Sequence, residues 1–161
     1  EVTGGTQVTA NDAFTETADK TYYAHWEITE VFSVTVPVVL PLTVDENGEV
    51  HTGVAEIINA STGDVIVSSV SISTKNGWKL VPFVTDMAHE KVDAKLLGFQ
   101  INDAQTSKNG DAETFNLTAP WTIAESGRLP LDYDAVVSAV SQPVTAQDVL
   151  SIVFVLEWGG E

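Results

Sequence analysis

Few side chains in this sequence have the chemistry of an active site, and their spacing does not assemble one. The three histidines are His25, His51 and His89, and none of them has the neighbouring histidine that a paired imidazole metal site needs. Cysteine is absent, which excludes a thiol nucleophile and a cysteine-bound metal. The Gly-x-Ser-x-Gly elbow of serine hydrolases is also absent. The sequence therefore predicts a protein that is not an enzyme, with no catalytic residue, no metal site and no essential histidine.

Carboxylates are numerous, and two groups of them have the composition of known kinds of site. Asp132 and Asp134 alternate onto one face of an expected strand, and a pair of carboxylates is what a glycosidase requires. Asp45, Glu46 and Glu49 crowd one turn, and Ca²⁺ takes several oxygen ligands from loops. With 23 acidic residues among 161, such groups also arise by chance, and the EF-hand pattern is missing. We expect no cofactor, with calcium as the alternative.

Two tryptophans suggest a different activity, the binding of a polysaccharide. Trp121 follows Pro120 in a polar loop, and we expect it to be the most exposed aromatic side chain. An exposed tryptophan can stack on a sugar ring, so Trp78 and Trp121 are the candidate carbohydrate-binding residues. The structural alternative is that Trp121 closes one end of the fold. A cell-wall or polysaccharide binding module is therefore the alternative function, with cell-wall polysaccharide as the partner.

The charge of the chain excludes two classes of partner. Seven basic residues stand against 23 acidic ones, for a net charge of -16 at pH 7. Nucleic acid is not an expected partner, because binding to phosphates depends on Lys and Arg side chains. The same argument disfavours anionic membrane surfaces. No apolar stretch approaches the ~18 residues of a membrane span, so we expect no membrane insertion.

Location is predicted from the start of the chain and from its cysteine content. The sequence begins Glu1-Val2-Thr3, without an initiator methionine, as a chain does after removal of a signal peptide. Cloning produces the same start, and the absence of cysteine fits secreted and cytosolic proteins alike. We expect a secreted protein that is extracellular or at the cell surface.

Alternating apolar and polar residues, interrupted by turn signals, predict an all-β fold. Asn-Gly dipeptides, the strongest short signal for a tight hairpin turn, occur at 47–48, 76–77 and 109–110. A strand pattern begins at Tyr22 and recurs along the rest of the chain. The density of turns indicates one antiparallel β-sandwich over residues 21–161, Greek-key or jelly-roll-like, with about eight to ten strands.

Individual elements can also be predicted from the pattern. Residues 54–59 and 65–73 read as a hairpin, with a bulge at Ser68-Ser69. At most one short helix is expected, near 86–97, and the strand at 150–158 is expected inside a sheet because both its faces are apolar. Pro37 and Pro41 predict an edge strand or a crossover between sheets. The expected core consists of Trp26, Phe32, Val34, Val36, Val70, Ile72, Trp78, Leu80, Ile152, Phe154 and Leu156.

Residues 34–80 resemble a known group of proteins. The segment contains Val34-Thr35-Val36-Pro37 near its start and Asn76-Gly77-Trp78-Lys79-Leu80 at its end. It resembles uncharacterised secreted surface proteins of Gram-positive bacteria. The triplet Trp78-Lys79-Leu80 is similar to the first motif of WxL cell-wall-binding domains, whereas residues 156–159 lack the final leucine of the second motif. The resemblance implies a location at the bacterial surface, and peptidoglycan as a partner for the binding alternative.

The N-terminal arm, residues 1–20, is polar and buries too little apolar surface to order itself. We expect it to serve as a donor strand that leaves the domain and completes the sheet of a neighbouring copy. Its candidate subunit-contact residues are Val2, Thr6, Val8, Ala10 and Phe14. Because such a contact joins two different surfaces, it generates a homopolymer. The predicted function is a non-enzymatic secreted structural subunit of an extracellular filament or surface layer.

Overall fold

The computed structural model describes residues 29–45, 49–115 and 117–159 of the chain. Over these residues the fold is almost entirely β, and the only helix is a three-residue 3-10 turn, η1. The strands are β1 Val34–Thr35, β2 Leu42–Val44, β3 Val50–Thr52, β4 Glu56–Asn59, β5 Val65–Thr74, β6 Lys79–Leu80, β7 Leu96–Ile101, β8 Ala104–Gln105, β9 Ala112–Phe115, β10 Trp121–Ile123, β11 Arg128–Pro130, β12 Tyr133–Val137 and β13 Leu150–Trp158. These thirteen strands exceed the eight to ten expected, because several long apolar patterns break into short strands.

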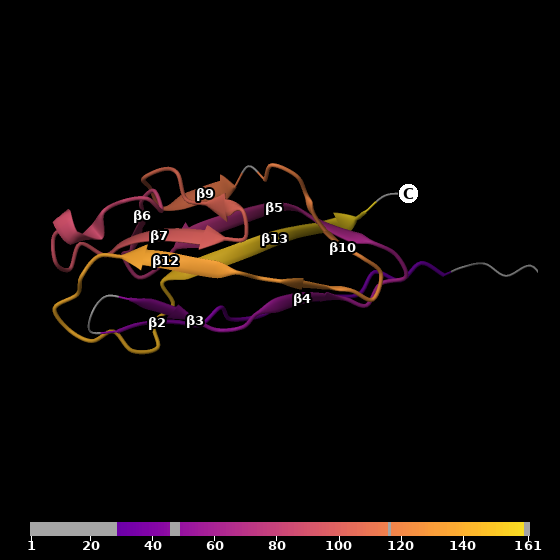
Figure 1. Ribbon diagram of the computed structural model, residues 1–161, viewed down its shortest axis with the longest axis horizontal. Helices are drawn as coiled ribbons and strands as arrows, with labels where there is room; N and C mark the ends of the chain where they lie inside the picture. Colours follow the sequence, from indigo (N-terminus) through magenta and orange to yellow (C-terminus); the bar gives the residue numbers. More distant parts are fainter. Residues whose placement is uncertain (1–28, 46–48, 116, 160–161) are drawn as a thin grey trace, which may run out of the picture.

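The strands form an elongated antiparallel β-sandwich, as predicted (Figure 1). One sheet has the order β1-β4-β11, and another has the order β10-β5-β13 with β9 also paired to β5. A third sheet, β12-β7-β6 with β8, and the β2-β3 hairpin lie toward the end of the molecule that is opposite the end of β13, and β9 also lies there (Figure 1). Every pair is antiparallel except β6 with β7. The hydroxyl of Tyr133 on β12 donates to the Pro41 carbonyl at 2.7 Å and so fixes the hairpin to its neighbouring sheet.

One apolar core lies between the sheets and confirms much of the predicted list. Val70, Ile72, Trp78 and Leu80 are buried there. Val34, Val36, Ile152, Phe154 and Leu156 are partly buried and pack against it. The prediction for Phe32 is wrong, because its side chain is 45% exposed and packs on Trp158 at the end of the molecule. Trp26 lies outside the described residues.

The predicted hairpin of residues 54–59 with 65–73 is wrong, because its two strands belong to different sheets. β4 pairs with β1 and β11, whereas β5 pairs with β9, β10 and β13. The chain crosses between layers at Asn59, whose buried amide donates to the carbonyls of Gly63, Ile123 and Ala124 at 2.9, 3.0 and 3.0 Å. Two of these hydrogen bonds attach Asn59 to the end of β10, which pairs with β5 in the other sheet. The predicted bulge is confirmed, since the register between β5 and β13 shifts by one residue at Ser68.

The helix predicted near 86–97 is wrong beyond its first turn. Only Met87–His89 is helical, and Asp86 caps this turn by accepting a hydrogen bond from the Ala88 N–H at 3.0 Å. Asp93 and Lys95 have φ values of 64° and 54°, which an α-helix does not allow. β7 then begins at Leu96, so apolar residues that suggested a helix belong to a strand.

The dipeptide Asn76-Gly77 forms the tight turn that the sequence predicts. Its residues have φ values of 54° and 81°, and the Trp78 N–H donates to the Lys75 carbonyl at 3.1 Å. The turn does not close a hairpin, because the next strand, β6, pairs with β7 in another sheet. At 109–110 only Gly110 has a positive φ, so that dipeptide is not the same turn. The dipeptide at 47–48 includes residues outside the described ones.

We predict that Gly77→Val destabilises the protein by roughly 1 kcal/mol or more, because a β-branched side chain is strained at positive φ. Thr122→Val is the matched control, since Thr122 is exposed on strand β10. The free energy of unfolding, measured in urea for both variants, checks the prediction. Equal stability of the two variants would contradict the assigned turn.

Candidate functional site: the open edge of strand β13

Among the described strands, β13 has the longest edge that no other strand pairs with. The sequence predicts this strand inside a sheet, but among the described residues it pairs only with β5, so that prediction is wrong. The two apolar faces of β13 have different surroundings. Its inner face contacts the core, whereas Val153 and Val155 on its outer face are 56% and 40% exposed.

The hydrogen-bonding direction of β13 alternates along the strand. The Lys75 N–H donates to the Val149 carbonyl at 2.9 Å, and the Gly159 N–H donates to the Asp64 carbonyl at 2.8 Å. Because antiparallel ladders use every second residue of a strand, the odd-numbered residues of β13 bond to β5. The even-numbered residues from Leu150 to Trp158 therefore direct their N–H and C=O groups away from β5. No other strand of the described chain pairs with this side.

The inward side chains of β13 are less well covered than those of β5. On β5, Val65, Val67 and Val70 are 0% exposed. The even-numbered residues Leu150, Ile152, Phe154 and Leu156 of β13 are only half-buried, although they belong to the same apolar core. This difference means that β13 exposes one flank of the core together with its unpaired backbone groups.

β13 also lacks the features that usually protect an edge strand. Proline, lysine and inward-pointing charges block the addition of further strands. The segment 150–158 contains none of these, and its single charged residue, Glu157, points outward. The edge strand β1 is different, because it is only two residues long and Pro37 and Pro41 follow it. The prediction that these prolines mark an edge strand or crossover is confirmed.

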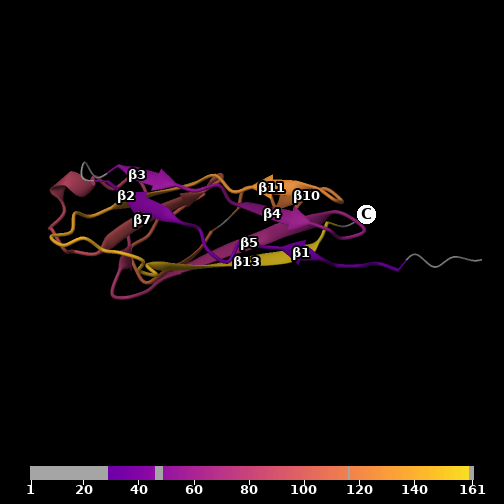
Figure 2. The same ribbon diagram turned by 90° about the horizontal axis from the view of Figure 1, so that it is seen from below.

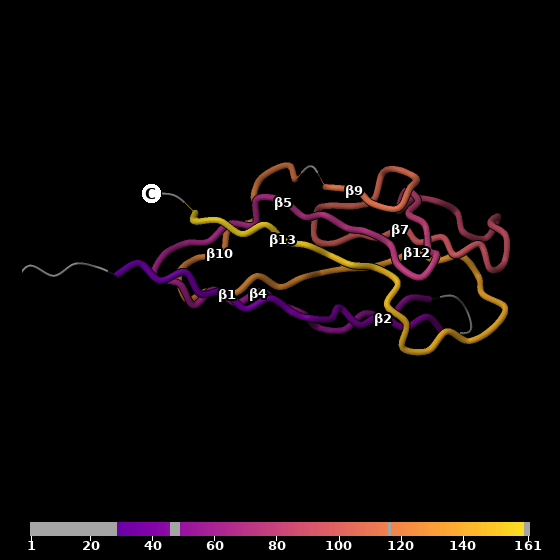
Figure 3. The backbone as a smooth tube through the Cα atoms, turned by 180° about the vertical axis from the view of Figure 1, so that it is seen from behind, coloured from indigo at the N-terminus to yellow at the C-terminus, as the bar shows by residue number. Residues whose placement is uncertain are grey.

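The described chain begins beside the end of β13. The Thr62 N–H donates to the Val31 carbonyl at 3.1 Å, and the Val31 N–H donates to the Thr62 hydroxyl at 3.0 Å. The rings of Phe32 and Trp158 meet edge to face, with their centroids 5.2 Å apart. Figure 2 shows β1 and the last part of β13 toward the same end of the molecule. Figure 3 shows the segment that enters β1 and the last part of β13 at this same end. The predicted contact residues Val2, Thr6, Val8, Ala10 and Phe14 precede it and lie outside the described residues.

Both tryptophans chosen for carbohydrate binding are buried. Trp121 is 9% exposed, and its indole N–H donates to the Asp103 carboxylate at 2.7 Å. Trp78 is 6% exposed, and its indole N–H donates to Gln147 at 3.2 Å. The burial of Trp121 agrees with the structural alternative given above and not with an exposed side chain. Neither ring offers a free face to a sugar, so these side chains give no support to polysaccharide binding.

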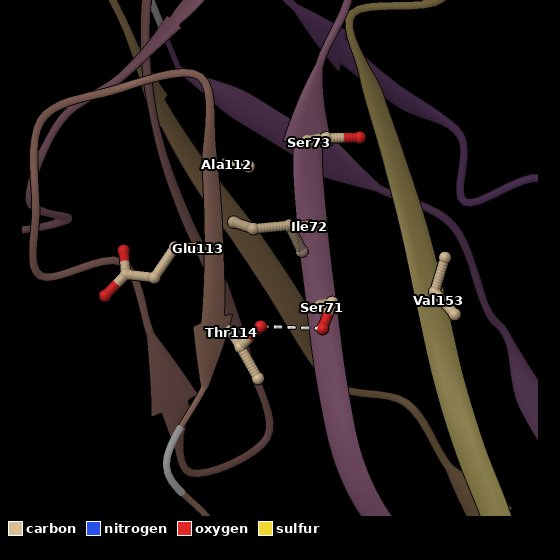
Figure 4. A pocket seen from close by; sticks show the side chains of 7 residues that line it. All are labelled: Ser71, Ile72, Ser73, Ala112, Glu113, Thr114 and Val153. Atoms are coloured by element: carbon tan, nitrogen blue, oxygen red, sulfur yellow. Dashed lines mark hydrogen bonds between the residues drawn. The ribbon is translucent and has the colours of Figure 1, made fainter.

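A shallow hollow of about 270 Å³ lies on the outer face of the β9-β5-β13 sheet (Figure 4). The hydroxyls of Ser71 and Thr114 are hydrogen-bonded to each other there, 2.8 Å apart. Glu113, the one ionisable residue of the lining, accepts hydrogen bonds from the hydroxyl and backbone N–H of Ser107. In this lining, the Glu113 carboxylate thus bonds to Ser107 and not to the hydroxyls of Ser71 and Thr114.

Asp45, Glu49 and His51 form a cluster on the β2-β3 hairpin that the sequence reasoning only partly anticipated. Their ligand atoms lie within 4.8 Å of one another. Val44 pairs with Val50 across the hairpin, so Asp45 lies opposite Glu49. The Asp45 carboxylate accepts a hydrogen bond from the Glu49 N–H at 2.9 Å. The sequence pattern does not reveal how β2 and β3 are aligned. In the structure, Thr43 pairs with His51, and this alignment brings His51 to the two carboxylates. Two carboxylates are few for Ca²⁺, which takes six to eight oxygen ligands.

A second hollow, of about 550 Å³, lies between this hairpin, the 3-10 turn and β12. Asp134 lines it, but Asp132 does not, so the structure does not bring the predicted carboxylate pair to one cleft. Asp86 also lines it. The backbone N–H of Ala88 and the side chain of His89 lower the pKa of Asp86 by hydrogen bonding, so this group is a carboxylate at neutral pH.

Replacing His25, His51 and His89 together with glutamine should leave folding and self-association unchanged near pH 7. His51 and His89 have side chains that are 60% and 84% exposed, so their removal leaves no cavity. Thermal unfolding and sedimentation of the triple variant check this expectation. A loss of association in the variant would show that a metal or a proton on histidine is needed.

Comparison of the chain with protein-family models, with curated proteins and with solved structures finds no match to any of them. In the described part of the chain, no helix has the length and apolar content needed to cross a membrane. Among the described residues, the edge of β13 is the longest strand edge without a partner strand.

Proposed function

We propose that the protein is a non-enzymatic structural subunit that associates with copies of itself outside the cell, in a filament or surface layer. The N-terminal arm of one copy adds as a strand to another copy. The observation that carries this proposal is the edge of β13, which no described strand pairs with and which is nine residues long, without proline or lysine.

An added strand would give partners to the outward backbone groups of β13 and would cover its half-buried inner side chains. The five even-numbered residues of β13 would gain partners for their backbone groups, and each hydrogen bond contributes about 0.5–1.5 kcal/mol net. The half-buried side chains of Ile152, Phe154 and Leu156 would lose their remaining contact with water. Main-chain pairing supplies affinity in such contacts, and side chains that fit the exposed core supply specificity.

The geometry of the contact supports a polymer. The arm and the edge of β13 are different surfaces, so each copy can donate one strand and accept another. A net charge of -16 keeps unassembled copies apart, which suits a subunit that must remain soluble before it assembles. The absence of cysteine is compatible with an oxidising extracellular environment.

Electron microscopy and light scattering of the purified full-length chain over a range of concentrations test this proposal. We expect filaments or sheets of regular repeat, with a scattering mass that rises with concentration. A monomer of 17.2 kDa at every concentration, with no ordered assemblies in the images, would contradict it.

A further inference from the structure

We propose that Asp45, Glu49 and His51 on the β2-β3 hairpin form a binding site for a divalent transition-metal ion, with Zn²⁺ as the ion that their chemistry fits best. The site is independent of the proposed function, because it uses neither β13 nor the N-terminal arm. Three observations carry it: the face that the three side chains share, the distances between their ligand atoms, and the hollow that two of them line.

The alignment of the hairpin places the three side chains on one face. Val44 pairs with Val50, and the Asp45 N–H donates to the Glu49 carbonyl at 3.0 Å, which extends the pairing by one residue on each strand. Side chains alternate between the faces of a strand, so the two carboxylates and the imidazole lie opposite Val44 and Val50. Val50 packs against the core, and the side chain of His51, on the other face, is 60% exposed.

The ligand atoms are close to the separation that a metal ion requires. Asp45 Oδ2 and His51 Nε2 lie 3.6 Å apart, and the ligand atoms of all three residues lie within 4.8 Å of one another. In a tetrahedral zinc site with bonds of about 2.1 Å, two ligand atoms are about 3.4 Å apart. Small rotations of the side chains would therefore bring the set to bonding distance.

A hydrogen bond within the hairpin orients one of the carboxylates. The Glu49 N–H donates to Asp45 Oδ1 at 2.9 Å, and Oδ2 of the same carboxylate faces the imidazole of His51. Carboxylates that bind metal ions are commonly held by such hydrogen bonds, which fix the direction of the ligand oxygen. The hairpin thus supplies the support for a ligand as well as the ligand itself.

The donor set favours zinc over calcium. Ca²⁺ takes about six to eight oxygen ligands, whereas three protein ligands that include an imidazole, with water in the fourth position, suit Zn²⁺. The two carboxylates balance the charge of a divalent ion. The net charge of -16 attracts cations to the molecule as a whole, which supports binding at a site with three protein ligands.

The hollow of about 550 Å³ beside the cluster is a separate observation. Glu49 and His51 line it from the hairpin, and Asp86 and Asp134 line it from the cap of the 3-10 turn and from β12. A hydrogen bond from the Ala88 N–H lowers the pKa of Asp86, so the hollow holds a further negative charge at neutral pH. The hollow gives water access to the fourth coordination position, and its carboxylates add to the attraction for a cation.

A second histidine in this region provides a matched control. His89 Nδ1 lies 2.8 Å from Asp86 Oδ2, so His89 also contacts a carboxylate at the surface. Among the described residues, the cluster on the hairpin is the only group of three such ligands, and it does not include His89. Comparison of the two histidines therefore separates binding by the cluster from binding by an exposed imidazole next to one carboxylate.

Calorimetric titration of the metal-free full-length chain with Zn²⁺ tests the inference, with His51→Gln and Asp45→Asn as site variants and His89→Gln as the control. Asparagine keeps an oxygen that can accept the Glu49 N–H, so Asp45→Asn removes the charge and retains the turn contact. We expect one ion per chain, a loss of affinity of about tenfold or more in both site variants, and no change in the control. Circular dichroism without metal should be the same for all four chains.

Nitrogen NMR of the histidine rings identifies the ligand directly, because Zn²⁺ shifts the resonance of the nitrogen that binds it. The inference predicts a shift at His51 and none at His89. No binding of Zn²⁺, equal affinity in His51→Gln and the natural chain, or equal affinity for Ca²⁺ would overturn the inference. Light scattering of the same samples measures association separately, so the failure of the metal site would leave the proposed function in place.

Discussion

Deletion of residues 1–16 should convert the associating protein into a folded monomer. The truncated chain keeps every described strand, so its circular dichroism should remain that of a β protein. It loses the proposed donor strand, and with it the main-chain hydrogen bonds that this strand would make to a second copy. Sedimentation velocity should therefore show a single species of monomer mass where the full-length chain forms large assemblies.

A synthetic peptide of residues 1–16 provides the matched control for this deletion. Added to the full-length chain, the peptide should occupy the edge of β13 and stop growth, whereas a scrambled peptide of equal composition should not. Without the peptide, the truncated protein leaves an unpaired edge exposed and is expected to aggregate slowly and without order. A truncated chain that assembles like the full-length chain would refute the role of the arm.

Replacing Ile152 with lysine should reduce association by about tenfold or more, which corresponds to ~1.4 kcal/mol. Ile152 is half-buried on the inner face of β13 and opposes Ile72 of β5. An inward-pointing charge on an edge strand is tolerated while it reaches water, but an added strand would bury it. The variant should thus fold as a monomer and fail to accept the arm, as measured by light scattering.

Val153→Lys is the control for this variant, because it places the same side chain on the next residue of the strand. Val153 points outward and is 56% exposed, so lysine there stays in water with or without an added strand. Its association should match that of the natural chain. If both variants associate equally well, the inner face of β13 does not take part in the contact.

The fold class could be predicted from the sequence, because local pattern and turn chemistry determine it. The alternation in 150–158 predicts a strand, and its even-numbered residues do contact the core. Asn76-Gly77 forms the turn that its two residues favour. The bulge at Ser68 was visible as a slip in the apolar phase, which is a property of one strand alone.

Which strands share a sheet could not be predicted, because pairing depends on contacts between distant residues. The turn after Asn59 looks like a hairpin turn, yet the side chain of Asn59 bonds to Ile123 and Ala124, more than sixty residues away, and the chain changes sheets. Positive φ values at Asp93 and Lys95 likewise interrupt a helical pattern that composition alone allows.

The position of β13 at the edge of its sheet also could not be predicted, because it too depends on pairing with distant residues. A strand that is apolar on both faces reads as central, and only the structure places β13 at an edge with Val153 and Val155 exposed. Burial of Trp78 was expected from its place in the predicted core, whereas the polar sequence around Trp121 does not reveal the Asp103 carboxylate that accepts its indole N–H. The predicted contact residues of the arm remain a prediction.

Hydrogen exchange at the backbone amides of β13 tests the central claim most directly. The amides of Ile152, Phe154 and Leu156 point away from β5, so in the truncated monomer they should exchange rapidly, while those of Ser151, Val153 and Val155 are protected. In assemblies of the full-length chain, the three even-numbered amides should become protected to the same degree as the odd-numbered ones. Rapid exchange at Ile152, Phe154 and Leu156 in the assembled protein would show that no strand is added to β13.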